Sequence, residues 1–458
     1  METTGDTENS AVARGWAGRL LRPFAEVRAC EVVTALLLAL TIFTILTAYY
    51  LLKVIREPLI LMSSGAEVKS YAAAGQAVLL LPVLRAHGAI AQRTGRLKLI
   101  SAVMLFCAIN LVVFAVLYRM GVSIGLPFYL WVGTFNFLLV ATFWSFANDI
   151  YSPEQGKRLF PLIGVGSTVG ALAGAGLASF LLRHLGPMQL MLLAAGLLVA
   201  TLASFAWVSG HQRCRPRDRA TILPASAPVK GRGGFEALLS DRYLLLIGVI
   251  AILSNWVTNS GEYVLDRTLV DLVHHNGVTN PAEITRFIGG FKADYFWWVN
   301  VVALLCQLFV VSRLIKHLGV GTALLILPLV SMVGASAIAL FPALWVIRQA
   351  KIAEKGIDYS VENTTLNALY LVVPRDAKYR AKAVVDTFLV RFGDVCAAMA
   401  IWIGVRLGLP TRAFATLNVL LAVVWVVVAW RVAAIHRARS GAQHAAETTA
   451  ASGVPIPA

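Results

Sequence analysis

The chain has 458 residues, of which 58% are hydrophobic and 14% are charged. So few charged side chains cannot cover a water-soluble protein of this length, and the mean hydropathy of +0.73 indicates an integral membrane protein. The net charge of +16 comes from Lys and Arg dispersed among short loops, which excludes a nucleic-acid-binding stripe and makes anionic membrane lipids the expected partner.

Twelve apolar segments are long enough to cross a membrane as helices, whereas a barrel would show alternating segments of about ten residues. We therefore predict an all-α membrane protein with twelve transmembrane helices. In chain order the spans are expected at residues 32–62, 70–91, 99–118, 125–149, 159–182, 187–209, 242–264, 295–313, 319–341, 343–372, 382–404 and 411–433.

A polar stretch rich in Arg, Pro and Gly divides these spans into six and six. It predicts a cytoplasmic amino-terminal segment, an N-terminal six-helix half, a basic cytoplasmic linker, a C-terminal six-helix half and a flexible tail. Their ranges are 1–31, 32–209, 210–241, 242–435 and 436–458. Lys and Arg are concentrated in the amino terminus, the loops after even-numbered spans and the tail, so we expect both termini to be cytoplasmic.

The five cysteines are scattered, and no pair has the CxxC spacing of a metal or redox site. No phosphate-binding loop and no arrangement of nucleophile, His and acid is visible in the sequence. We therefore expect no metal, no cofactor and no enzymatic activity.

The loop between the second and third spans carries a fold-level motif, "GAIAQRTGRLKLI" at residues 88–100. It resembles the loop signature of the major facilitator superfamily, although Gln92 stands where that superfamily has an acid. The matching positions are Gly88, Arg93, Gly95, Arg96 and Lys98. The resemblance implies a six-plus-six architecture that binds substrate near the membrane midplane and works by alternating access.

Four further stretches narrow the family. They are "LLKVIREPLIL" (51–61), "FWSFANDIYSPEQGKRLFPLIGVGS" (143–167), "DYSVENTTLNALYLVV" (358–373) and "AKAVVDTFLVRFGDV" (381–395). Together they resemble the nucleotide transporter (ATP/ADP translocase) family, most closely its free-living bacterial members. The resemblance implies exchange of ATP for ADP, or nucleotide uptake, across a bacterial inner membrane.

The chain departs from the plastid and parasite exchangers of that family at two places. Its fourth span carries no acid before Phe143, and Leu366 stands where those exchangers have Lys. The resemblance therefore supports the family's fold for this chain more strongly than it supports the family's substrate.

In the first span, Lys53, Arg56 and Glu57 interrupt an otherwise apolar run. Lys53 lies roughly 32 Å along the helix from Val32, near the far interface, so it could extend toward water and pair with Glu57. The apolar "PLILM" beyond these residues favours a second interpretation, in which Arg56 and Lys53 line the substrate path and Glu57 balances their charge.

Span ten is the most polar, and its charges recur every three or four residues along one helical stripe. The stripe consists of Arg348, Lys351, Lys355, Asp358 and Glu362, and Asn363 follows it. We expect it to line a wet cavity that binds an anionic substrate, because such a stripe cannot face lipid. The alternative is an internal ladder of ion pairs, such as Lys351 with Glu354 or Lys355 with Asp358.

Spans four, seven and eleven add five more candidates. Arg391 is the preferred phosphate contact because a guanidinium binds phosphate through two hydrogen bonds, and Asp394 is its expected partner. Asp386 and Glu262 join Glu57, Asp358, Glu362 and Asp394 as gating or coupling residues. Asn136, in the middle of span four, is a candidate substrate ligand or a helix–helix hydrogen bond.

The leading hypothesis is thus a transporter of nucleotides with an anionic small molecule as its substrate. A second hypothesis keeps the fold and changes the cargo to another organic anion or metabolite, with proton coupling through Glu262, Glu362 or Asp386. A third is a membrane sensor or scaffold that does not transport. Gly166, Gly170 and Gly174 predict close helix packing, and we expect a monomer.

Overall fold

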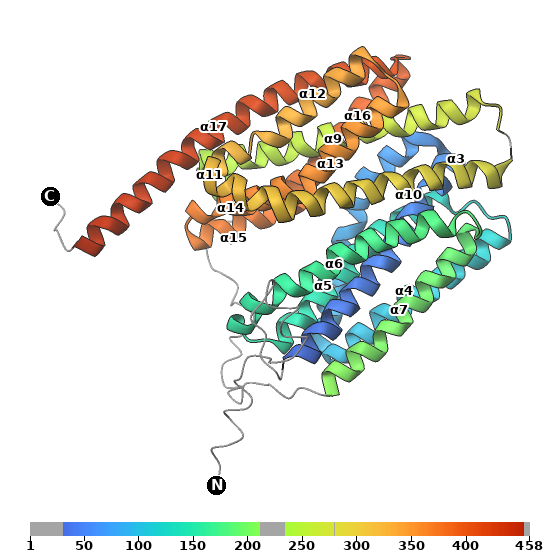
Figure 1. The fold of residues 1–458 in the computed structure, drawn as a ribbon, viewed down its shortest axis with the longest axis horizontal. Helices are drawn as coiled ribbons and strands as arrows, with labels where there is room; N and C mark the ends of the chain where they lie inside the picture. The colour runs from blue at the N-terminus through green and yellow to red at the C-terminus, as the bar shows by residue number, and fades with distance from the viewer. Residues whose placement is uncertain (1–30, 211–233, 279, 453–458) are drawn as a thin grey trace, which may run out of the picture. The chain divides into compact units, whose positions relative to one another are not determined.

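The computed structural model describes residues 31–210, 234–278 and 280–452, and every regular element in these ranges is a helix. Figure 1 shows the course of the chain. In order, the long α-helices are α3 (Val32–Arg93), α4 (Arg96–Arg119), α5 (Gly125–Ile150), α6 (Pro153–Leu181), α7 (Pro187–Gly210), α9 (Arg242–His275), α10 (Pro281–Leu305) and α17 (Thr411–Ser452).

Shorter helices complete the second part of the chain. They are α8 (Gly234–Ser240), α11 (Ser312–Ala323), α12 (Ile326–Leu340), α13 (Leu344–Ile357), α14 (Asn363–Leu369), α15 (Arg375–Val384) and α16 (Val390–Arg406). Three π-helical turns, η2 (Cys306–Val311), η3 (Asp358–Glu362) and η5 (Val385–Leu389), join some of them, and a 3₁₀ turn, η4 (Tyr370–Val372), follows α14.

Two glycines explain how these helices provide twelve spans. Gly65 inside α3 and Gly319 inside α11 have φ angles of 82° and 77°, which an L side chain adopts at a steric cost. Each break ends one membrane-crossing segment and begins the next. The expected all-α, twelve-helix membrane protein is therefore confirmed in the described residues. Residues 1–30 of the predicted segment 1–31 and most of the predicted linker 210–241 lie outside them.

The eighth span differs from its expected position. The apolar content predicts a start at residue 295, but α10 begins at Pro281 and carries Lys292 and Asp294 within the helix. Lys292 is almost fully buried, so this charge faces protein. The sequence pattern misses the first half of the helix because its charged side chains resemble those of a loop.

The described residues form two compact units. Unit 1 contains those of the ranges Met1–Ser64, Gly75–Val229 and Thr279–Trp297, and unit 2 contains those of Gly65–Ala74, Lys230–Val278 and Trp298–Ala458. Within unit 1, α4 packs along α7, and within unit 2, α12 packs along α17 (Figure 1).

Glycines on α6 bring it into backbone contact with α3 inside unit 1. A Cβ atom added at Gly166 or Gly170 would lie 2.4 Å from the carbonyl oxygen of Ala39 or Phe43. The Thr47 hydroxyl donates a hydrogen bond of 3.2 Å to the Gly170 carbonyl. The small residues expected to mark close packing therefore serve an intramolecular helix crossing.

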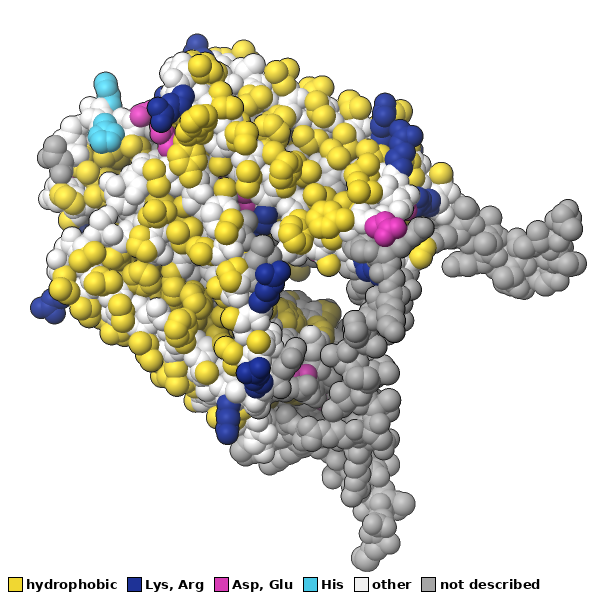
Figure 2. Space-filling model, turned by 180° about the vertical axis from the view of Figure 1, so that it is seen from behind, with side chains coloured by type: hydrophobic (Ala, Val, Ile, Leu, Met, Phe, Trp, Pro, Cys, Tyr) yellow, Lys and Arg dark blue, Asp and Glu magenta, His cyan; other side chains and the backbone are white. Residues whose placement is uncertain are grey.

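The outer surface of the helices is apolar, as a lipid environment requires. Large hydrophobic side chains such as Val78, Val333 and Trp345 are more than half exposed. On the face shown in Figure 2, hydrophobic side chains cover most of the described surface and Lys and Arg are few. In a bilayer this surface is in contact with acyl chains.

Candidate substrate-binding site

A cluster of charges lies inside unit 1 where α3 meets the first part of α10. Glu57 is only 1% exposed, and its two carboxylate oxygens have different partners. Arg56 Nε donates to Oε1 at 3.2 Å, and Lys292 Nζ lies 3.8 Å from Oε2. A buried carboxylate is stable only when its charge is compensated, so Glu57 is held by two cations from two helices.

Aromatic rings enclose the cations of this cluster. Lys53 Nζ lies 4.3 Å from the centre of the Phe296 ring and 4.9 Å from that of Tyr50. The Arg56 guanidinium carbon lies 4.6 Å from the centre of the Tyr129 ring. Ring faces attract cations without neutralising them, so the rings stabilise Lys53 and Arg56 in their charged forms.

The cluster unites three residues expected from the sequence, Lys53, Arg56 and Glu57, with one that the sequence pattern missed. Lys292 precedes residue 295, where the sequence pattern predicts the start of the eighth span. The segment "GFKADYFWW" nevertheless carries an amphipathic helical pattern that extends α10 toward its start. Among these four residues, three positive charges face one negative charge. The geometry therefore places three basic side chains and one acid in a largely buried cluster.

A second network lies in unit 2 between α13 and α9. Lys351 Nζ contacts Glu354 Oε1 at 2.7 Å and donates to the backbone oxygen of Thr258 at 3.1 Å. The Thr258 hydroxyl in turn donates to Glu354 at 3.0 Å. The Lys351–Glu354 pair is one of the two ion pairs expected under the structural alternative for span ten, and its hydrogen bonds to Thr258 fix α13 on α9.

Two further pairs of unit 2 are less deeply buried. Lys355 Nζ lies 3.1 Å from Glu262 Oε1, with both side chains partly exposed. Arg391 Nη1 donates to Asp394 Oδ2 at 3.0 Å, and Asn259 donates to Asp394 Oδ1 at 2.6 Å. The expected partnership of Arg391 with Asp394 is therefore present. The Arg391 side chain is 34% exposed, so a ligand can contact it without a rearrangement of the helices.

Three further candidates differ in burial, and a fourth has a buried polar atom. Asn363 and Asp386 are exposed, and Arg348 is half-buried on α13. The carbonyl oxygen of the Asn136 side chain is buried and has no hydrogen-bond partner among the described residues. The structure thus brings the first-span residues together in unit 1, whereas most of the other candidates belong to unit 2, where several form separate pairs.

Two buried polar contacts were not expected from the sequence. In unit 2, Lys69 Nζ donates to Asp266 Oδ2 at 2.6 Å, and both residues are buried. In unit 1, the buried carboxylate of Glu31 accepts hydrogen bonds from Arg158 at 3.0 Å and from Gln155 at 2.9 Å. Gln155 also completes the capping box that starts α6, so the helix start and the ion pair support each other.

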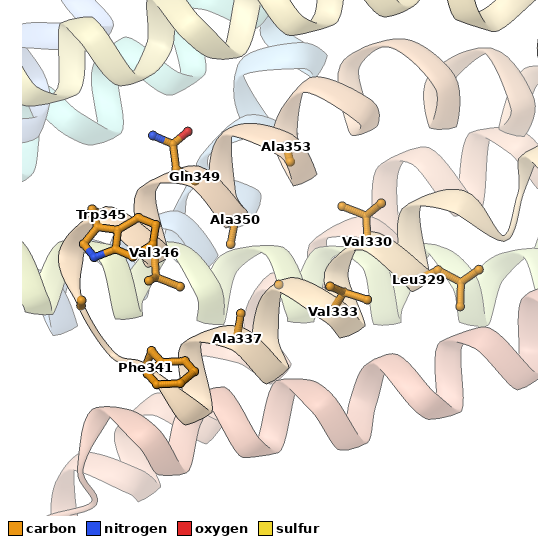
Figure 3. A pocket seen from close by; sticks show the side chains of 12 residues that line it. Leu329, Val330, Val333, Ala337, Phe341, Trp345, Val346, Gln349, Ala350 and Ala353 are labelled. Carbon is orange, nitrogen blue, oxygen red and sulfur yellow. The ribbon is translucent and has the colours of Figure 1, made fainter.

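An apolar groove of about 830 Å³ lies between α12 and α13 of unit 2 and is separate from these charges. Its walls include Val333, Phe341, Trp345 and Val346, which point into the groove in Figure 3. On α13 the groove side chains and the charged stripe occupy opposite helical faces, because they differ by about half a turn at 100° per residue. The groove therefore faces the acyl chains and is unsuited to an anionic substrate.

The arrangement of the spanning helices resembles the fold of transporters of the major facilitator type. The fold is similar to the crystal structure of the nucleoside transporter NupG, with a TM-score of 0.58, 14% identity, and 88% of this chain and 98% of that chain covered. It is also similar to a bacterial homologue of the iron transporter ferroportin in an inward-facing state, with a TM-score of 0.61, 12% identity, and 87% and 98% covered.

The sequence defines the family. The model of the TLC ATP/ADP transporter family matches residues 114–353, more than half of the chain, and the chain belongs to this family. It is 24% identical over 351 residues to ADP,ATP carrier protein 1 of Chlamydia pneumoniae, covering 66% of this chain and 65% of the relative. It is 24% identical over 335 residues to ADP,ATP carrier protein 4 of Rickettsia felis, covering 64% and 62%. The match thus spans slightly less than two thirds of these relatives.

Proposed function

We propose that this protein transports nucleotides, by exchange of ATP for ADP or by nucleotide uptake, and that the α3–α10 cluster of unit 1 binds their phosphates. The observation that carries this proposal is the sharing of Glu57 between Arg56 and Lys292. A carboxylate held by two cations occupies the place that a phosphate oxygen would take. Arg56 offers paired N–H donors, the geometry that suits phosphate.

The proposed binding event is an exchange of partners. When a nucleotide arrives, its phosphates compete with Glu57 for Arg56 and Lys292, so little new desolvation is required. Lys53 adds positive charge among aromatic rings, which also offer flat faces for a base. In unit 2, the Lys355–Glu262 and Arg391–Asp394 pairs are the proposed exchangeable contacts, and Lys351 is a positioning residue.

The membrane and orientation form part of the same proposal. The distribution of Lys and Arg among the loops supports cytoplasmic termini, and the resemblance to free-living bacterial members supports the inner membrane of a bacterium. The glycine face of α6 is occupied by α3, which supports a monomer.

Transport in liposomes tests the proposal. We expect uptake of labelled ATP into vesicles loaded with ADP, and competition by unlabelled ATP or ADP outside. Uptake that requires internal nucleotide identifies an exchanger, and uptake into empty vesicles identifies net import. Absence of nucleotide uptake by correctly oriented protein, with uptake of another organic anion in the same vesicles, would contradict the nucleotide assignment and leave a carrier of different cargo.

A further inference from the structure

Glu362 differs from the other acidic residues of the spanning helices. It ends the π-helical turn η3, is 1% exposed, and both of its carboxylate oxygens lack a hydrogen-bond partner among the described residues. By contrast, Glu262 pairs with Lys355, Asp394 accepts from two donors, and Asp386 is exposed.

The elements that pack most closely against η3 are η2, α12, α13 and α14. Neither α12 nor α14 contains a charged residue, and η2 offers only the Cys306 thiol and the Gln307 amide. Buried Val311 and Ala323 lie in the apolar cluster around Val361, the neighbour of Glu362.

The nearest charged groups lie earlier along the same helical run. Asp358 is one turn before Glu362, so its charge adds to the repulsion when both acids are ionised. Tyr359, at the surface of η3, is partly exposed. Two of the three cations of α13 have other acids as partners, since Lys351 contacts Glu354 and Lys355 contacts Glu262. The third, Arg348, lies 14 residues before Glu362, roughly 21 Å earlier along the helix.

An ionised carboxylate buried without a partner costs several kcal/mol, and binding one proton to one of its oxygens removes that cost. We propose that Glu362 carries a proton in this conformation, and that binding and release of this proton couple nucleotide transport to the proton gradient. The coupling part rests on the proposed function. Each proton that moves with a nucleotide cancels one of its negative charges, so the proton reduces the electrical work of import.

The position of Glu362 supports a role in the transport cycle. π-Helical turns are rare and occur frequently at functional sites. Here Glu362 is the last residue of one of them, η3, which directly follows α13 and its paired cations. When the surroundings of η3 change so that water or a cation reaches the carboxyl, the proton leaves and the carboxylate remains.

The first test measures the proton itself. Infrared spectroscopy of purified protein in lipid, recorded over a pH series, detects the C=O band of protonated carboxyl groups. We expect a band that persists at neutral pH in the wild type, is absent from Glu362→Gln, and is retained in the matched exposed variant Glu283→Gln. If Glu362→Gln leaves the neutral-pH band unchanged, the proton assignment is overturned, whatever the substrate.

The second test measures coupling. Glu362→Gln resembles the protonated acid, so we expect normal folding and normal ATP/ADP exchange in loaded vesicles. Uptake of ATP into empty vesicles with an acidic exterior should be stimulated in the wild type and in Glu283→Gln, abolished by a protonophore, and lost in Glu362→Gln. Wild-type exchange combined with uptake that ignores the pH gradient would overturn the coupling while leaving nucleotide transport intact. Absence of both exchange and uptake in the wild type would overturn the proposed function together with the coupling.

Discussion

Adding one methyl group to Gly170 should destabilise unit 1. The added Cβ would lie 2.4 Å from the Phe43 carbonyl oxygen and 2.8 Å from the Phe43 Cα atom, which is about 1 Å closer than van der Waals contact. Because these atoms belong to backbone, the helices must separate. Overpacking of this size costs about 1–3 kcal/mol, and the hydrogen bond from Thr47 is weakened as well.

Thermal unfolding of purified Gly170→Ala in detergent measures the effect. At roughly 2–4 °C per kcal/mol for a domain of this size, we expect a melting temperature lower by several degrees. Gly164→Ala on the same helix is the matched control, because no atom lies within 4 Å of its Cβ position. That variant should be neutral or slightly more stable, since Ala favours helix over Gly. Equal melting temperatures for the two variants would refute the close approach of α3 and α6.

Three other changes have defined outcomes. Glu57→Gln removes the carboxylate that competes with phosphate for Arg56 and Lys292. The melting temperature of the ligand-free protein should therefore fall, while ATP should bind more tightly in a titration. Weaker ATP binding would contradict the proposed exchange of partners. Lys69→Ala leaves Asp266 buried without its cation and should cost about 3–5 kcal/mol, whereas Lys69→Met combined with Asp266→Leu should recover most of the melting temperature. Burial alone would raise the pKa of Asp241, but hydrogen bonds and charge from Arg439 lower it. The pair therefore stabilises the folded protein above the ordinary Asp pKa of about 3.9, and this stabilisation disappears as the pH falls toward the lower pKa of the folded state. The difference in melting temperature between the wild type and Arg439→Gln should therefore be at most a few degrees at neutral pH and vanish in acid; a constant difference would exclude this linkage.

Much of the fold could be predicted from the sequence because lipid imposes a strong constraint on composition. Apolar length alone located most spans, and helical spacing predicted the contact of Lys351 with Glu354 three residues later. The start of α10 could not be found in this way, since Lys292 is buried by protein and its charge mimics that of a loop.

The partners of the candidate site were harder to predict. Lys69 and Asp266 are 197 residues apart, and only the packing of helices brings them together. Helical spacing offers Asp358 on the same helix as a possible partner of Lys355, whereas the structure gives it Glu262 from α9. Periodicity identifies which charges share one helical face, but it contains no information about the neighbouring helix.

The nucleotide affinity of Lys292→Gln tests the central claim most directly. Titration of the purified protein with ATP compares it with the wild type and with Lys316→Gln, an exposed Lys changed in the same way. Loss of a charge-assisted contact of about 1.5–3 kcal/mol predicts roughly 10- to 100-fold weaker binding in Lys292→Gln alone. Wild-type affinity in a folded Lys292→Gln protein would show that the α3–α10 cluster does not bind the phosphates.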